Sequence, residues 1–133
     1  MFWFLIYIFL LMRFYFYGFL FFAWFLSVIY NASLPSRVPV GLGNLDKIIH
    51  FFYYIPGGFL SFMYFRAFGQ ISPFVPFLLV FFVSITDEFI QSFIPGRQAD
   101  FFDIVADTFG IILGIYLGII RERIKNKSER EKN

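Results

Sequence analysis

The chain has 133 residues, of which 59% are hydrophobic and 26% aromatic, and only 15% carry a charge. A chain this short cannot bury so much apolar surface in one soluble core, and a disordered chain needs low hydrophobicity. A net charge of +2 and the absence of cysteine exclude a basic nucleic-acid-binding face and all disulfide or thiolate chemistry. The composition therefore predicts a small all-α, polytopic membrane protein with the lipid bilayer as its main partner and no nucleic-acid ligand.

Four apolar stretches are each long enough to cross a bilayer, since a spanning helix needs about 20 apolar residues. We place these spans at about residues 12–31, 45–65, 73–94 and 100–120. Residues 1–10 form either a helical extension of the first span or an interfacial segment, where aromatic rings are favoured. Residues 1–120 are thus predicted to form a four-helix transmembrane domain.

The segments between the spans carry the turn and helix-breaking residues. Residues 32–44 are rich in proline and glycine and read as a loop, and Pro95-Gly96 predicts a tight turn before the fourth span. Pro56, followed by two glycines, predicts a kink or an unusually close helix contact within the second span. Residues 121–133 form a basic tail that we expect to be helical at first and then frayed.

Lysine and arginine are distributed unevenly between the two predicted ends of the bundle. Four spans place both termini on one side, and positive residues favour the cytoplasmic side. The side of the termini holds eight basic residues, namely Arg13, Arg66, Arg121, Arg123, Lys125, Lys127, Arg130 and Lys132. The other side holds three, namely Arg37, Lys47 and Arg97. This asymmetry predicts that both termini are cytoplasmic.

Six of the nine acids and the single histidine gather at the opposite, outward side. Ionisable residues inside a membrane are costly and therefore indicate function by default. At helical spacing they form polar stripes on the second, third and fourth spans, and the simplest packing turns these stripes toward each other. The residues concerned are Asp46, His50, Asp87, Glu88, Asp100, Asp103 and Asp107, with Gln91 and Arg97 nearby in sequence.

Some of these features have a purely structural interpretation. Gly110, Gly114 and Gly118 repeat at every fourth position, which is typical of a surface for close helix packing. Asp100 is placed to cap the fourth helix, and Asp103 to interact favourably with its dipole. The basic tail is expected to anchor the chain at an anionic membrane surface.

Four motifs in order resemble the VanZ-like family of bacterial membrane proteins. They are Asp46-Lys47-x-x-His50, Asp87-Glu88-x-x-Gln91, Pro95-Gly96-Arg97 and Asp103-x-x-x-Asp107-x-x-Gly110-x-x-x-Gly114, and the resemblance covers about residues 44–118. It implies a four-helix, multi-pass protein of the bacterial cytoplasmic membrane. The family's namesake is associated with low-level resistance to the glycopeptide teicoplanin, and no settled reaction comes with the family. Members often have Asn at the position of Asp107, so this site is more anionic than the family pattern.

The first functional hypothesis is a binding role in cell-envelope homeostasis or glycopeptide resistance. An outward-facing polar pocket would bind a lipid-linked envelope precursor, another cell-wall component or a glycopeptide-related ligand. Arg97 and Lys47 would hold a phosphate or carboxylate, and the acids would orient these bases or recognise an amine. The candidate ligand-binding residues are Asp46, Lys47, His50, Asp87, Glu88, Gln91, Arg97, Asp103 and Asp107.

The alternatives are an intramembrane hydrolase or transferase, a small ion- or proton-coupled transporter, and a purely structural role in which the polar stripes only hold the helices together. In the enzyme, His50 would be the general base and Asp87 or Glu88 the acid. A divalent cation such as Mg²⁺, Mn²⁺ or Zn²⁺ would instead use the candidate metal ligands His50, Glu88, Asp103 and Asp107. In the transporter, Glu88 and Asp107 would exchange protons, and four helices would require a homodimer.

Overall fold

The computed structural model describes residues 2–35, 43–69 and 72–132, and every regular element in these residues is an α-helix. The helices are α1 (Phe2–Ala32), α2 (Gly43–Ala67), α3 (Phe74–Gln91) and α4 (Phe101–Arg130). All four are long and apolar enough to cross a membrane. The predicted all-helical, four-span fold is therefore confirmed. Arg37 and most of the predicted 32–44 loop lie outside the described residues.

Helix boundaries differ from the predicted spans at three places. The helical extension is the arrangement found for the first residues, because α1 is continuous from Phe2. Helix α3 ends at Gln91 rather than near Ile94, since Pro95 disfavours helical backbone in the residue before it and has no N–H to continue the ladder. Helix α4 continues to Arg130, through most of the predicted tail.

The tight turn at Pro95-Gly96 and the cap at Asp100 are found as predicted. Gly96 has a φ of 82°, the left-handed region that glycine adopts without steric cost. The Asp100 side chain accepts a hydrogen bond of 2.8 Å from the backbone N–H of Phe102 and so caps α4. The α3–α4 connection is therefore short and fixed at both ends.

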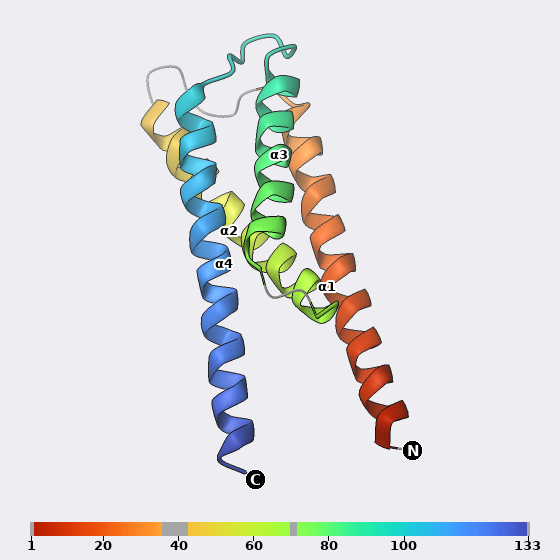
Figure 1. Ribbon diagram of the computed structural model, residues 1–133. Coiled ribbons are helices and arrows are strands. Elements are labelled where there is room, and N and C mark those ends of the chain that lie inside the picture. Colours follow the sequence, from red (N-terminus) through yellow and green to blue (C-terminus); the bar gives the residue numbers. More distant parts are fainter. Residues whose placement is uncertain (1, 36–42, 70–71, 133) are drawn as a thin grey trace.

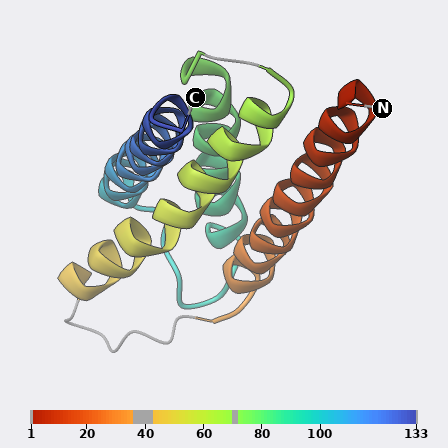
Figure 2. The same cartoon turned by 90° about the horizontal axis from the view of Figure 1, so that it is seen from below.

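Helices α2 and α4 form the most extensive contact of the bundle, and α2 crosses α4 obliquely (Figures 1 and 2). Glycines allow this closeness. A Cβ on Gly58 would lie 2.9 Å from the Ile111 Cα, and one on Gly114 would lie 2.7 Å from the Phe59 backbone nitrogen. The expected close helix contact near Pro56 is thus present, and Gly110, Gly114 and Gly118 all face α2 as a packing surface.

The core is a column of apolar and aromatic side chains shared by all four helices. Trp24 of α1 packs against Gly57 and Tyr54 of α2, with the Trp24 and Tyr54 rings edge to face at 5.5 Å. The most buried members are Tyr17, Trp24, Val28, Tyr54, Phe62, Met63, Val80, Val83, Ile111 and Ile115. Phenylalanine instead dominates the exposed outer surface, as expected where the neighbour is lipid.

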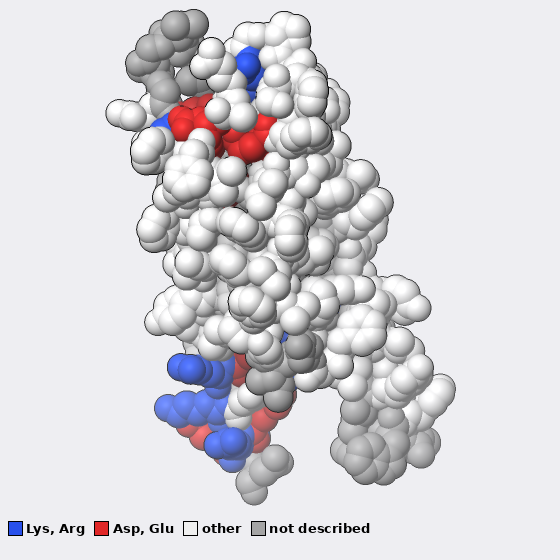
Figure 3. Space-filling model, turned by 45° about the horizontal axis from the view of Figure 1, so that its top comes forward, with Lys and Arg blue, Asp and Glu red and all other residues white. Residues whose placement is uncertain are grey.

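Charged residues separate to the two ends of the bundle. In Figure 3 one group of acids lies near the upper end, whereas basic side chains, with other acids among them, cluster at the projecting lower end. Helix α1 begins and α4 ends at the same lower end (Figure 1). The upper end, where α2 and α4 begin and α3 ends, positions the site described next.

Candidate functional site

Asp107 lies at the centre of a buried hydrogen-bond network that joins three helices. It comes from α4 and is fully buried. Its Oδ1 is 2.9 Å from Nδ1 of His50 on α2, and its Oδ2 accepts a 2.6 Å bond from the hydroxyl of Ser84 on α3. The His50 ring is thereby held in one orientation, as a carboxylate commonly fixes a functional imidazole.

A second buried carboxylate, Asp87 of α3, lies beside the first. It accepts a 2.9 Å bond from the Tyr54 hydroxyl and a 2.7 Å bond from the Gln91 side-chain amide one turn along the same helix. Both Asp87 oxygens therefore have donors within the bundle. The polar stripes of α2, α3 and α4 do turn toward each other, and the contacts between them are specific.

Lys47 lies at the rim of this network and pairs with α4. Its ammonium bonds to Asp100 and lies 3.2 Å from the Asp103 carboxylate. The Lys47 ammonium and the N–H of Phe102 together hold the pKa of the Asp100 carboxyl below its usual range. The ion-pair partners of Lys47 are therefore these two acids.

Glu88 connects α3 to the start of α4 and keeps one oxygen unpaired. Its Oε2 accepts a 2.8 Å bond from the backbone N–H of Asp100. Its Oε1 is buried and has no hydrogen-bond partner among the residues that the structure describes. A buried oxygen without a donor costs free energy.

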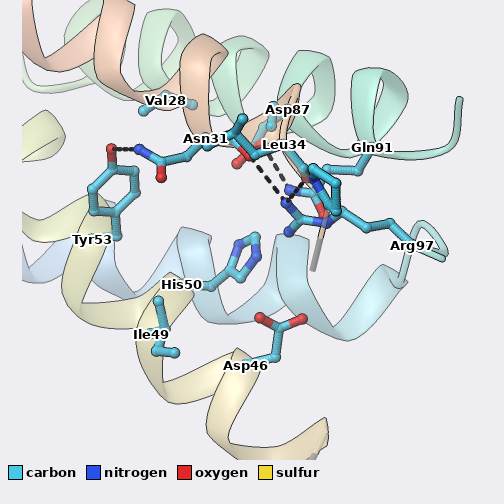
Figure 4. Close-up of a pocket in the computed structure, with 12 residues that line it drawn as sticks. Val28, Asn31, Leu34, Asp46, Ile49, His50, Tyr53, Asp87, Gln91 and Arg97 are labelled. Carbon is cyan, nitrogen blue, oxygen red and sulfur yellow. Dashed lines mark hydrogen bonds between the residues drawn. The ribbon is translucent and has the colours of Figure 1, made fainter. Parts of the chain in front are cut away.

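A pocket of about 200 Å³ opens beside His50 between α1, α2 and α3 (Figure 4). Arg97 extends from the α3–α4 connection into it, donating bonds of 3.1 and 3.4 Å to the backbone carbonyls of Asn31 and Leu34. The lining combines polar groups with the apolar side chains of Val28, Ala32 and Ile49. It is complete only when α1 is present, because Asn31 and Leu34 position the Arg97 guanidinium.

The structure divides the nine predicted ligand-binding residues into two groups. Those that line the pocket are Asp46, His50, Asp87, Gln91 and Arg97. The other four, Lys47, Glu88, Asp103 and Asp107, are not among the lining residues and instead pair with or orient their neighbours. Lys47 therefore pairs with Asp100 and Asp103 and does not line the pocket beside Arg97, with which it was expected to hold a phosphate or carboxylate.

The contributions of α1 and of the neutral hydroxyl groups are additional to the predicted site. Asn31 lines the pocket and donates a 3.0 Å bond to the hydroxyl of Tyr53, which also lies 2.7 Å from the Ser27 hydroxyl. Asn31 ends an otherwise apolar span, and this was the only available signal. Ser84 and Tyr54 share the helix faces of the acids, as their spacing in the sequence indicates, but they are not among the predicted ligand-binding residues.

The order of these motifs on four apolar helices agrees with one protein family. The model of VanZ/LLP1 matches residues 4–122, nearly the whole chain. This chain belongs to the VanZ/LLP1 family. No curated protein and no solved structure gives a match. The region matched by the VanZ/LLP1 model extends beyond the motifs at 44–118 and includes most of α1 and the first charged residues of α4.

This VanZ/LLP1 site also contains two sets of side chains with the geometry of a cation site. His50, Asp87 and Asp107 offer ligand atoms within 4.8 Å of one another, and so do Asp46, His50 and Asp103. Within the described chain, Glu88 belongs to neither set, and the predicted ligands Asp103 and Asp107 fall into different ones. The four metal candidates therefore do not form one group, and His50 is the shared member.

Proposed function

We propose that this VanZ/LLP1 protein binds the polar head of a lipid-linked or cell-wall component in the pocket beside His50. The bound component would lie at the outer face of the cytoplasmic membrane, where the predicted topology places the pocket. Through this binding the protein would act in cell-envelope homeostasis or change susceptibility to glycopeptides such as teicoplanin.

The observation that carries the proposal is the position of Arg97. Its guanidinium is tethered through one nitrogen, Nη1, to the backbone carbonyls of Asn31 at the end of α1 and of Leu34 just after it. A guanidinium has five N–H donors in a fixed fork, so others remain to hold a phosphate or carboxylate. Such an arrangement pre-orients a cation at a pocket wall before a ligand enters.

The rest of the lining suggests a ligand with both charges and an apolar part. Asp46 and Asp87 contribute carboxyl groups that suit an amine to the same lining as the cationic Arg97. Val28, Leu34 and Ile49 supply apolar contact. A headgroup that carries an amine beside a phosphate or carboxylate and is attached to a hydrocarbon chain matches this mixture.

The direct test is Arg97→Gln, in a host where the wild-type gene changes teicoplanin susceptibility. We expect the variant to lose that effect at equal protein level, because the anionic group of the ligand loses its charged partner. Arg130→Gln is the matched control, since it removes the same charge from the far end of α4. Unchanged susceptibility in Arg97→Gln would exclude the pocket as the functional element.

Binding is measured separately on purified protein with a lipid-linked cell-wall precursor as the probe. A charge-assisted hydrogen bond contributes roughly 1.5–3 kcal/mol, so Arg97→Gln should weaken binding by about tenfold or more. Equal affinity in Arg97→Gln and Arg130→Gln would contradict the assigned role of Arg97.

A second candidate function, an intramembrane hydrolase or transferase, is favoured by the pairing of His50 with Asp107. When Nδ1 donates to the carboxylate, Nε2 is left as the proton acceptor, which is the arrangement of an oriented general base. The neighbouring carboxylates would alternatively hold a divalent cation together with His50. Of the two candidate catalytic acids, Asp87 has a carboxylate oxygen within 4.8 Å of a ring nitrogen of His50. Glu88 belongs to neither of the His50-containing sets.

Metal analysis of purified wild-type protein and of His50→Ala distinguishes the versions of this candidate. A stoichiometric metal that is lost in His50→Ala would support the metal-dependent enzyme. Product formation from the lipid-linked precursor, abolished in His50→Ala without any metal, would support the general base. Binding of the precursor without turnover in wild-type protein would leave the binding function alone.

A further inference from the structure

Three arginines converge on one buried carboxylate at the end of the bundle opposite the pocket described above. Glu122 of α4 is 7% exposed. Its Oε1 lies 2.8 Å from Nη2 of Arg13 and 3.1 Å from Nη1 of Arg121, and its Oε2 lies 3.8 Å from Nε of Arg66. One negative charge thus faces three positive charges contributed by α1, α2 and α4.

Arg13, Arg66 and Glu122 of this cluster also line a second pocket, of about 350 Å³. Among the described residues, α1 and α4 make no backbone contact and separate toward this end (Figure 2), so the ion pair of Arg13 with Glu122 bridges a gap. The lining residues are Leu10, Arg13, Arg66, Ala67, Phe68, Gly69, Glu122, Lys125 and Asn126. Lys125 adds a further positive charge at the rim.

The pocket lies where helices leave the apolar region. Helix α2 ends directly after Arg66, and the charged turns of α4 begin at Arg121. The apolar span of α1, by contrast, starts at Tyr7 and continues past Arg13. One side of the pocket is therefore a basic helix and the other an exposed apolar one that includes Phe9 and Leu10.

We propose that this pocket binds the phosphate of an anionic phospholipid from the leaflet at the side of the two termini. Guanidinium groups bind phosphate oxygens through paired N–H donors, and basic pockets between spans are typical sites for anionic headgroups. The single Glu122 carboxylate orients the arginines and leaves an excess of positive charge for the phosphate. The adjoining apolar face of α1 favours a lipid over a free phosphate ion, because it contacts hydrocarbon.

The experiment measures thermal unfolding of the full chain in detergent during titration with phosphatidylglycerol, phosphatidylcholine or inorganic phosphate. We expect phosphatidylglycerol to raise the unfolding temperature by several degrees at concentrations where the other two have no effect. An equal effect of phosphatidylcholine would overturn the anionic site. An equal effect of inorganic phosphate would overturn the lipid as its occupant.

Variants then locate the effect. Arg66→Gln should weaken the phosphatidylglycerol response at least fivefold. The matched control is Arg123→Gln, which removes an exposed arginine next to Glu122 on α4 and should retain the response. Lys125→Gln replaces Arg66→Gln as the test if the latter does not fold, because Lys125 is at the rim. Glu122→Gln should retain or strengthen the response, since it removes the competing carboxylate. Loss of response in Arg123→Gln but not in Arg66→Gln would overturn the assignment.

Discussion

At the residue scale, Asp107 shows how an ionisable group is accommodated inside an apolar bundle. Placing a charge at mid-bilayer costs roughly 2.5–3.5 kcal/mol even on the mildest scale. Asp107 offsets part of this cost by accepting from both His50 and Ser84, and it is fully buried away from lipid. The same residue joins α2, α3 and α4 and fixes the ring that faces the pocket.

The first prediction compares two substitutions at this position. Asp107→Ala should lower stability by about 2–4 kcal/mol, because it leaves the His50 and Ser84 donors without an acceptor and opens a cavity. Asp107→Asn should cost less, since the amide oxygen still accepts one bond in the same volume. Thermal unfolding of purified protein in detergent measures both. Equal losses for Ala and Asn would show that the hydrogen bonds to Asp107 contribute little.

At the element scale, the pairing of α2 with α4 holds the site together. Glycine faces the partner helix on both sides of this contact, which brings the two backbones close. His50 and Asp107 lie on these same two helices, so the closeness of the backbones sets the distance between the two side chains. Any residue that pushes α2 from α4 should therefore also disturb the site.

The second prediction concerns Gly114→Ala. A Cβ there would lie 2.7 Å from the backbone nitrogen of Phe59 and would overlap the carbonyl of Ile55. Overpacking of this kind typically costs about 1–3 kcal/mol. Ile112→Ala on the exposed face of the same helix is the control and should cost less, because Ile112 is 50% exposed. Thermal unfolding measures both, and a smaller loss for Gly114→Ala would argue against close backbone packing.

At the scale of the whole molecule, the two ends of the bundle differ in charge. Acids with Lys47 and Arg97 lie at the end where α2 and α4 begin, and most basic residues lie at the end where α1 begins and α4 ends. The positive-inside rule then predicts that the basic end is cytoplasmic. The proposed envelope ligand requires this orientation, because its pocket must face outward.

The third prediction tests the orientation by labelling single cysteines, which the cysteine-free chain allows. Gln98→Cys, in the exposed α3–α4 connection, should react with a membrane-impermeant maleimide in intact cells. Lys127→Cys, exposed near the end of α4, should react only after the cells are permeabilised. The reverse pattern would place the pocket beside His50 in the cytoplasm and remove the basis for an outward-facing ligand.

The positions of the spans and of the polar stripes follow from the sequence because they depend on local order. Apolar length determines how many helices cross the bilayer, and helical periodicity puts His50, Asp87 and Asp107 on inward faces. Glu122 is not among the predicted site residues, because its position in the sequence places it in the basic tail. It follows Gly118 by four residues and so continues the glycine face of α4, which was the available signal.

By itself the sequence determined the membrane class, the four helices, the family resemblance and the set of polar residues from which a site is built. Only the tertiary structure decided how these residues pair. In the tertiary structure Lys47 pairs with Asp100 and Asp103, and Arg97 lies at the pocket and bonds to Asn31 of α1. Arg13 pairs with Glu122, which is 109 positions away in the sequence. The physical reason is that periodicity fixes the face on which a side chain lies, whereas its partner depends on the crossing and closeness of helices. Those depend here on glycines that let α2 and α4 touch.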